Sequence, residues 1–322
     1  MKDIPEYLLD EPNGTYKKGE KTKLEIAEAA IIAHPEDKEL LWVFIAIHFQ
    51  HTFRYNECVE HCQNVLPQMK DNDCIEETLL FLGHALNNLK RFEEAIEARK
   101  KRMELVPLKK GDIVAIIEIY EKLKDHANAI KYYEQLLESN NGIADSDDYE
   151  KLAKHYDELM DYRNAHTYYE IAARANPDKG SFLWCNAGRA LALMKKEKEA
   201  EFYFRMALKL DLENAYPHYY LAVMYRNKDD IYMAMHHYNE ALKIKPDFPG
   251  VLNNLAQLHF EELSDIAGAI EQMERAINMN PQKEILLLLY RNLVVLYKKI
   301  TDYDKVDYYK SKWVELNEAD NN

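Results

Sequence analysis

Apolar and small residues recur along this chain at a spacing of 34 or 35 residues. Inside each copy they fall at helical intervals in two successive stretches, which predicts two helices per copy. Three copies in the second half of the chain are the clearest: Tyr149, Leu152, Ala153, Tyr156, Ala165, Tyr169, Ala172 and Pro177; Trp184, Ala187, Gly188, Leu191, Ala200, Phe204, Ala207 and Leu212; and His218, Leu221, Ala222, Tyr225, Ala234, Tyr238, Ala241 and Pro246.

Weaker copies extend the pattern in both directions to about eight units. The positions that face the turn of each unit step by 34 to 37 residues: Cys58, Ala95, Ala129, Ala165, Ala200, Ala234, Ala269 and Val306. The units span approximately 39–75, 76–109, 110–145, 146–180, 181–214, 215–248, 249–286 and 287–317. A period of this length predicts a serial array of small helical units.

The order of residue types, aromatic, Leu-Gly, Tyr, Ala, Phe or Tyr, Ala and Pro, resembles the tetratricopeptide repeat family. The resemblance implies an all-α fold, a right-handed α-solenoid of about eight antiparallel helix pairs with N- and C-terminal capping helices. Small residues such as Gly83, Ala153, Gly188 and Ala222 allow the second helix of a pair to approach the first closely. The alanine stripe of each second helix needs the following unit to cover it.

The two ends of the array require separate interpretation, because an open array must cover its terminal apolar faces. Residues 1–21 are expected to form a loosely ordered leader, and residues 22–37 a capping helix before the array of residues 38–317. The closing helix, at about Tyr303–Leu316, mixes charged residues with Tyr308, Tyr309 and Trp313, as a half-buried cap would. Residues 318–322 are a short tail.

Composition and charge narrow the classes of partner. The formal net charge of −14 disfavours nucleic acid, whose phosphates require clustered Lys and Arg, and disfavours anionic membranes. No apolar run reaches the length of a membrane span, and residues 1–14 lack the layout of a secretory signal. Four cysteines in 322 residues do not form a disulfide framework. These features predict a cytoplasmic protein that binds neither nucleic acid nor membrane.

Enzyme signatures are missing: there is no phosphate-binding glycine loop, GxSxG or HExxH. We therefore expect no catalysis, no cofactor and no metal. Cys58, His61 and Cys62 could suggest zinc, but both cysteines occupy core positions of their unit and are expected to be buried. The acidic run Asp145–Asp148 is expected to cap a helix. His236 and His237 are expected on a helix surface, with one ring partly packed.

The first helix of each unit carries the candidate binding site, because the resemblance implies that first helices line a concave groove. Asn186, Asn254 and Asn292 occupy one recurring position, interrupted by Tyr220, and are similar to the asparagine ladder of some tetratricopeptide superhelices. An amide both donates and accepts, so it can pair with any peptide unit. The predicted peptide-binding residues are Asn186, Arg189, Tyr219, Tyr220, Arg226, Asn253, Asn254, Gln257, Arg291 and Asn292.

An acidic, extended peptide would suit this groove, since arginines bind carboxylates and tyrosines offer flat contact area. The alternative is that these asparagines only keep a solvated helix face soluble. The family's clamp for acidic C-termini needs Lys, Asn and Arg on three consecutive first helices, and that set does not occur here.

The sequence predicts two further surface features, one apolar and one acidic. In the first units Val43, Phe44, Ile47, Leu80 and Phe81 form either an apolar groove for an amphipathic helix or additional core, and core is favoured. An acidic patch in the middle units is expected to be solvated; its residues are Asp147, Glu150, Asp157 and Glu158.

The sequence thus predicts a non-catalytic interaction module or scaffold that binds a peptide segment of another protein. Two alternatives stay open. One is a solenoid that self-associates through its terminal repeats, with Trp313 at the contact. The other is a non-catalytic subunit of a larger enzyme complex.

Overall fold

The computed structural model describes residues 30–106, 110–139, 145–262 and 264–318. In these residues the secondary structure is helical, without strands, and the fold is an all-α solenoid. The chain divides into two compact units, one up to Ala144 and one from Asp145 onwards. The predicted leader lies outside the described residues, as do residues 22–29 of the N-terminal capping helix and residues 319–322 of the tail.

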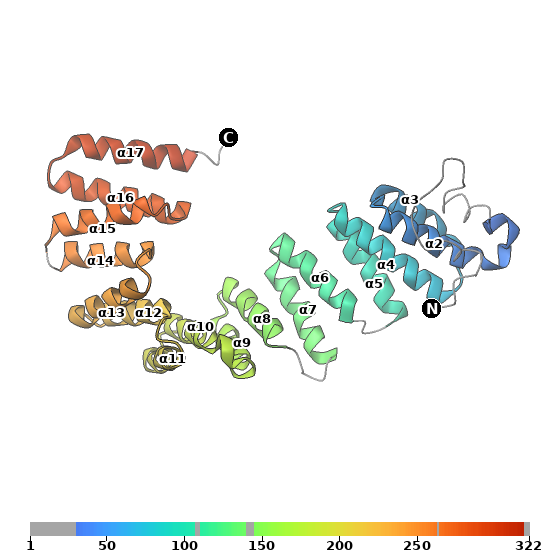
Figure 1. The fold of residues 1–322 in the computed structure, drawn as a ribbon, viewed down its shortest axis with the longest axis horizontal. Helices are drawn as coiled ribbons and strands as arrows, with labels where there is room; N and C mark the ends of the chain where they lie inside the picture. The colour runs from blue at the N-terminus through green and yellow to red at the C-terminus, as the bar shows by residue number, and fades with distance from the viewer. Residues whose placement is uncertain (1–29, 107–109, 140–144, 263, 319–322) are drawn as a thin grey trace. The chain divides into compact units, whose positions relative to one another are not determined.

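From Pro35 on, the described part of the N-terminal unit contains three pairs of α-helices, with short 3₁₀ turns before and after the first pair (Figure 1). Its elements are η2 (Pro35–Asp37), α2 (Lys38–His51), α3 (Tyr55–Val65), η3 (Leu66–Gln68), α4 (Asn72–Asn88), α5 (Phe92–Leu105), α6 (Lys110–Leu123) and α7 (His126–Ser139). Helix α4 begins four residues before the expected start of its repeat, because the side chain of Asp71 caps it by accepting from the backbone N–H groups of Asp73 and Cys74.

The C-terminal unit continues the same arrangement with five pairs of helices. Its elements are α8 (Ser146–Glu158), α9 (Tyr162–Ala175), η4 (Pro177–Lys179), α10 (Gly180–Leu193), α11 (Glu197–Leu210), α12 (Ala215–Asn227), α13 (Ile231–Ile244), α14 (Pro249–Glu261), α15 (Ile266–Asn278), α16 (Lys283–Lys299) and α17 (Tyr303–Glu318). Each helix packs on the next, as the stack from α14 to α17 in Figure 1 shows. First helices also meet across repeats: α10 contacts α12, and α14 contacts α16.

The turns inside the pairs share one feature. One residue in each takes a left-handed backbone conformation with φ between 55° and 60°: Phe53, Lys90, Lys124, Met160, Lys195, Asp229, Ser264 and Thr301. The N–H of the following residue then bonds to a carbonyl five residues back, as from Lys196 to Leu191 at 3.0 Å, except in the turn before α15, where Asp265 bonds to His259, six residues back. This regular bond offsets the strain of a side chain in the left-handed region, so the array needs few glycines.

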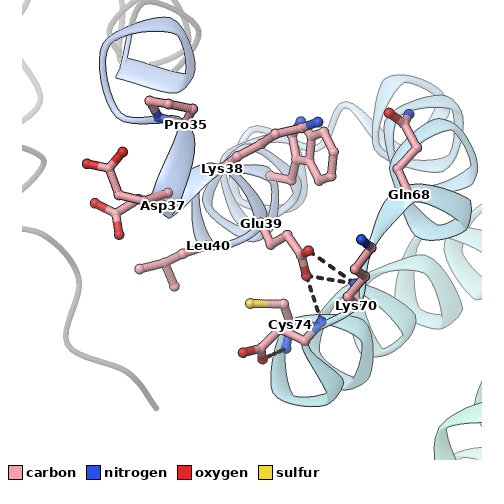
Figure 2. Close-up of a pocket in the computed structure, with 11 residues that line it drawn as sticks. Pro35, Asp37, Lys38, Glu39, Leu40, Gln68, Lys70 and Cys74 are labelled. Atoms are coloured by element: carbon pink, nitrogen blue, oxygen red, sulfur yellow. Dashed lines mark hydrogen bonds between the residues drawn. The ribbon is translucent and has the colours of Figure 1, made fainter.

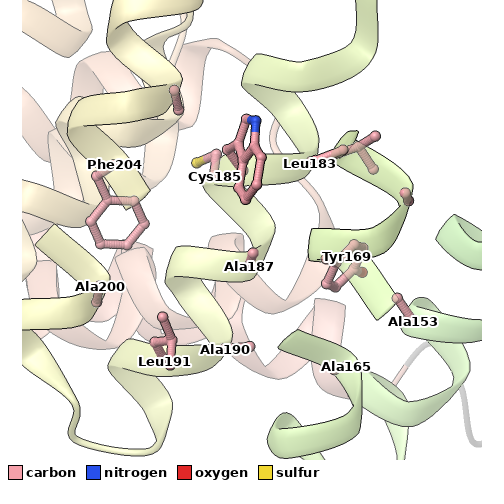
Figure 3. Packing of buried hydrophobic residues seen from close by; sticks show 14 of the residues in the cluster. Ala153, Ala165, Tyr169, Leu183, Cys185, Ala187, Ala190, Leu191, Ala200 and Phe204 are labelled. Carbon is pink, nitrogen blue, oxygen red and sulfur yellow. The ribbon is translucent and has the colours of Figure 1, made fainter. Parts of the chain in front are cut away.

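The core of the C-terminal unit is built from the residues that the repeat pattern selected. In Figure 3, Phe204 and Ala200 of α11 lie opposite Leu191 of α10, and all three side chains are buried. A Cβ atom added at Gly188 would lie 2.9 Å from Phe204 Cε1. The prediction that this position must be small is therefore confirmed, and the reason is contact with an aromatic ring of the second helix.

The equivalent stripe position in α5 is occupied by an arginine. Arg99 lies four residues after Ala95, where other repeats place Tyr169, Phe204 or Tyr238, and it is 2% exposed. Gly83 is again necessary, because a Cβ atom there would lie 3.2 Å from Arg99 Cγ. One stripe in the N-terminal unit is thus polar in its centre.

Candidate functional site

The ten predicted binding residues lie on four first helices of the C-terminal unit. Helix α10 carries Asn186 and Arg189; α12 carries Tyr219, Tyr220 and Arg226; α14 carries Asn253, Asn254 and Gln257; and α16 carries Arg291 and Asn292. We call these residues the first-helix face. Several of them bond to a partner one repeat away, so neighbouring first helices are joined along this face.

Arg226 joins α12 to α14. Its Nη1 donates to Oε1 of Gln257 at 3.0 Å, and its Nη2 donates to Oε2 of Glu261 at 2.8 Å. The charge of Arg226 is therefore paired within the chain, and only part of its five N–H groups is used. A ligand at this point would meet a guanidinium that already has a carboxylate partner.

Arg189 is paired in a similar way. Its Nη2 forms a short contact with Oδ2 of Asp157 on α8, and both side chains are largely buried. The other carboxylate oxygen of Asp157 is buried without a hydrogen-bond partner. Burial raises the pKa of Tyr220, which lies near Arg189, above its ordinary range.

The expectation of a solvated acidic patch in the middle units is wrong for two of its members. Asp157 is held by Arg189, and Glu150 is 9% exposed and bonded to Lys154 and Lys179. Lys179 also donates to Asp147 at 2.8 Å. Arg189 of the following repeat and Lys179 of the turn before it thus reach back to carboxylates of α8, contacts that the linear sequence does not show.

The asparagines of α14 and α16 form a directed chain of hydrogen bonds. Asn292 Nδ2 donates to Asn253 Oδ1 at 3.2 Å, and Asn253 Nδ2 donates to Asn254 Oδ1 at 3.5 Å. Asn253 differs from the expectation of an open groove position, because it is only 4% exposed. Its buried side chain links Asn254 and Asn292, which occupy two of the expected ladder positions.

Asn186 stands apart from this chain, on α10 with a half-buried side chain, whereas Arg291 on α16 is exposed. The structure therefore brings Asn253, Asn254 and Asn292 together and leaves Asn186 at a distance of two repeats along the array.

Tyr219 and Tyr220, two of the four tyrosines of α12, are both half-buried and pack against different rings. Tyr220 stacks on the ring of Phe204 with centroids 5.4 Å apart, which explains why an aromatic residue interrupts the asparagine series. Tyr219 packs against Phe248, at 5.3 Å, and lies 6.4 Å from the ring of Tyr238. Both therefore rigidify the first-helix face and offer ring edges to it.

Tyr238 of α13 belongs to this site, and sequence reasoning assigned it only to the core. Its ring and hydroxyl are fully buried. Burial raises the pKa of Tyr238 to about 12, and hydrogen bonding with Asn254 and Arg226 acts in the opposite direction. The sequence carried one signal of this: position 238 is a tyrosine, whereas the equivalent position of the preceding repeat is Phe204.

A separate hollow of about 440 Å³ lies at the N-terminal end of the described chain (Figure 2). The Glu39 carboxylate extends into it and accepts from the backbone N–H groups of Lys70, at 3.0 Å, and Asp71, at 2.8 Å. This carboxylate thus joins α2 to the start of α4. Glu39 therefore has a structural role.

The apolar residues of the first units belong to the core, as predicted. Val43 is buried in a cluster with Trp42, Val65, Met69 and Cys74. Ile31, Ile47 and Phe81 pack against that cluster. These contacts leave less apolar surface for a partner helix.

The buried cysteines and the capping role of Asp145 also follow the sequence predictions. Cys58 and Cys62 are buried free thiols, and Cys58 Sγ donates to the Ala46 carbonyl at 3.7 Å. Asp145 caps α8 by accepting from the Asp148 N–H at 2.8 Å. No group of three or more potential metal ligands occurs among the residues that the structure describes. None of the described helices is long and apolar enough to cross a membrane.

The serial helix pairs define an α-solenoid repeat protein. The family model of the tetratricopeptide repeat matches residues 76–101, 118–142, 183–214, 217–248 and 249–283. The chain belongs to the tetratricopeptide repeat family.

Two solved structures of repeat proteins with low sequence identity to this chain have the same fold. A tetratricopeptide repeat protein from Parabacteroides merdae has 15% identity and a TM-score of 0.56, over 75% of this chain and 93% of that one. The C-terminal part of a repeat-containing protein from Cytophaga hutchinsonii has 18% identity and a TM-score of 0.51, over 73% and 93%. At these identities the likeness concerns the fold alone. No curated protein matches the sequence.

Proposed function

We propose that the first-helix face of the C-terminal unit binds an extended segment of another polypeptide, and that the chain acts as a non-catalytic interaction module. Tetratricopeptide repeats generally mediate protein–protein interaction, which supports this class of function. The observation that carries the proposal is the asparagine chain from Asn292 through Asn253 to Asn254. Amides fixed by one another present their remaining donors and acceptors in set directions, which suits the repeating polar groups of a peptide backbone.

One end of the first-helix face suits the acidic residues that are expected in the ligand. Arg291 and Lys298 on α16 are exposed, whereas Arg189 and Arg226 already have carboxylate partners. Acidic residues of a bound segment would therefore lie over α16. Towards α12 the face favours uncharged polar groups, because further carboxylates would compete with Glu261 and Asp157.

The test begins with selection of twelve-residue peptides from a random display library on the immobilised full chain. The selected peptides are then titrated against the Asn254→Ala, Asn292→Ala double variant. Loss of these amides should weaken binding by about 1–3 kcal/mol, because polar groups of the ligand would remain unpaired. Asn239→Ala is the matched control, since Asn239 is an exposed amide on the second helix α13. Equal affinities for wild type and the double variant would exclude this face as the binding site.

Self-association is a second candidate, and one observation favours it. The last helix pair keeps large apolar side chains exposed: Val295, Ile300, Tyr303, Tyr308, Trp313 and Val314. A second copy of the chain could cover them. Light scattering over a dilution series separates the candidates, because a monomer at every concentration excludes self-association.

A further inference from the structure

We infer that the N-terminal unit binds a tyrosine side chain of another polypeptide in a hollow beside its second helices α3 and α5. The hollow has a volume of about 240 Å³, and its lining includes three leucines of α4 and one alanine of α5: Leu79, Leu82, Leu86 and Ala98. This site involves second helices of the N-terminal unit, so it goes beyond the first-helix face of the proposed function.

The residue type at position 98 explains why a hollow occurs here. Ala98 lies three residues after Ala95, which faces the turn of its repeat. In six other repeats this position carries a ring: His61, Tyr132, Tyr168, Tyr203, His237 and Tyr309. Each of these rings contacts a ring of the first helix in its own repeat, with centroids 5.4 to 6.0 Å apart. The ring therefore fills the space between the two helices, and an alanine leaves that space open.

The first helix α4 completes an apolar site for such a ring. Leu79 and Leu86 hold the repeat positions that Tyr149 and Tyr156 hold in α8, where both tyrosines stack on Tyr168. A ring that enters beside residue 98 would contact both leucines in the same way. Apolar hollows favour an aromatic guest over water, because water finds few polar partners in them.

The other repeat without this ring shows the same relationship. In α15 the equivalent position is Gln272, and a hollow of about 530 Å³ is lined by Gln272 and by Leu255, which holds the repeat position of Leu82. Charged residues also line that hollow: Glu240, Lys243 and Arg275. A polar side chain thus takes the place of the ring there, whereas leucines dominate the hollow beside Ala98.

Gln63 of α3 determines which aromatic residue fits best. In the last repeat the Tyr309 hydroxyl donates to Oε1 of Glu274, on the preceding second helix, at 2.9 Å. Gln63 holds the repeat position of Glu274 and also lines the hollow. Its amide oxygen can accept a hydrogen bond from a phenol, which phenylalanine does not have. The guest is therefore a tyrosine whose hydroxyl bonds to Gln63.

Ala98→Tyr tests whether a ring fits, because it supplies the ring that six other repeats carry. Its Tm should rise or stay unchanged, since the new ring would pack on Leu79 and Leu86. Ala98→Gln introduces the residue that position 272 carries and provides a second blocked variant. A fall in Tm for both variants would show that the space beside residue 98 is not open and would overturn the inference.

The binding experiment uses twelve-residue peptides with one fixed central tyrosine, selected by display on the immobilised full chain. An excess of a soluble blocked variant removes the sequences that bind elsewhere, including those that bind the first-helix face. The selected peptides should bind the blocked variants about tenfold more weakly than the wild type, because the ring has no place to enter. Gln272→Tyr is the matched control: it adds the same ring to the other hollow and should leave the affinity unchanged.

Two results of this selection would overturn the inference and leave the proposed function intact. One is the absence of any enriched sequence under competition. The other is equal affinity of the selected peptides for the wild type and the blocked variants.

The hydroxyl contact has its own measurement. Replacement of the peptide tyrosine by phenylalanine should weaken binding to the wild type about fivefold, the effect of one hydrogen bond. The same replacement should have no effect on binding to Gln63→Ala. A fivefold loss in both proteins would overturn the assignment of the hydroxyl to Gln63.

Two rival occupants give different results with the same peptides. Binding that tightens when the protein is diluted would assign the hollow to a second copy of the chain. Binding that tightens in a Tyr7→Ala, Tyr16→Ala variant would assign it to a tyrosine of this chain. Either result would overturn the assignment to another polypeptide.

Discussion

Arg99 and Asp112 form an ion pair in the interior of the N-terminal unit, with Arg99 Nη1 at 3.1 Å from Asp112 Oδ1 and exposures of 2% and 1%. The other carboxylate oxygen of Asp112 contacts Arg102, which also bonds to Glu76 at 2.7 Å. The charges of the two arginines and the two carboxylates therefore sum to zero. This cluster joins α4, α5 and α6, so it links two successive repeats through charge where other repeats use an aromatic ring.

Removal of one charge from this cluster should be costly. Asp112→Asn is expected to reduce the free energy of unfolding by about 3–5 kcal/mol, because two arginines would be left buried without their shared partner. The measurement is urea denaturation. Glu94→Gln is the control, since the Arg91–Glu94 pair in the same unit is exposed and should contribute little to stability. Similar losses for the two variants would contradict the assignment of a buried cluster.

The close approach at Gly188 predicts a second effect. Gly188→Ala should destabilise the protein by about 1–3 kcal/mol, because the new Cβ would lie 2.9 Å from Phe204 Cε1 and 3.1 Å from Tyr203 Cβ. Gly111→Ala has open space around the added atom and lies in helix α6, so it should stabilise by about 0.5–1 kcal/mol. Thermal unfolding should therefore shift in opposite directions for the same chemical change, and a shift in one direction for both would refute this account.

The histidine pair of α12 and α13 should make stability depend on pH. His218 Nδ1 and His237 Nδ1 are 2.9 Å apart, and the His237 ring stacks on Tyr225. The pKa of His237 is lowered from 6.5 to about 4, mainly by burial and also by His218, His236 and Arg205, while Glu240 opposes them. Burial also lowers the pKa of His218.

These lowered pKa values determine how stability changes with pH. Between pH 6.5 and about 4 the unfolded chain binds more protons at His237 than the folded chain, so stability is full above pH 6.5 and declines as the pH falls. Urea denaturation at a series of pH values measures this decline. His237→Phe keeps a ring against Tyr225 and should have a shallower profile from pH 7 to 5; identical profiles would exclude His237 as the titrating group.

Glu274 of α15 organises the last helix pair. Its Oε1 accepts from the hydroxyls of Tyr297, at 2.7 Å, and Tyr309, at 2.9 Å, and burial followed by this shared carboxylate raises the pKa of both tyrosines. Glu274→Ala should reduce the free energy of unfolding by about 2–4 kcal/mol, because two buried phenols lose their acceptor. Glu274→Gln retains an acceptor oxygen and should cost less in guanidinium denaturation. An equal loss for both variants would show that the hydroxyl bonds are not the cause.

The fold was predictable to a large extent, because the features that define it are local. The helical spacing of Ala165, Tyr169 and Ala172 identifies a helix face, and the return of these types after about 34 residues identifies a repeat. Gly188 and the N-cap Asp145 could be interpreted without knowledge of distant contacts. A solenoid also places sequence neighbours next to each other in space, so short-range patterns determine most of its packing.

The polar contacts between repeats were decided by the tertiary structure. Asp157 meets Arg189 after 32 residues, and Arg226 meets Glu261 after 35, because the register of one first helix on the next determines which side chains can touch. The repeat pattern locates each helix, but a shift of one turn would exchange these partners. The sequence by itself therefore determined the helices, their pairing and their apolar stripes. Only the packed structure determined which charges are neutralised and that the Tyr238 hydroxyl is buried beside Asn254 and Arg226, since both depend on distances between helices that sequence spacing does not specify.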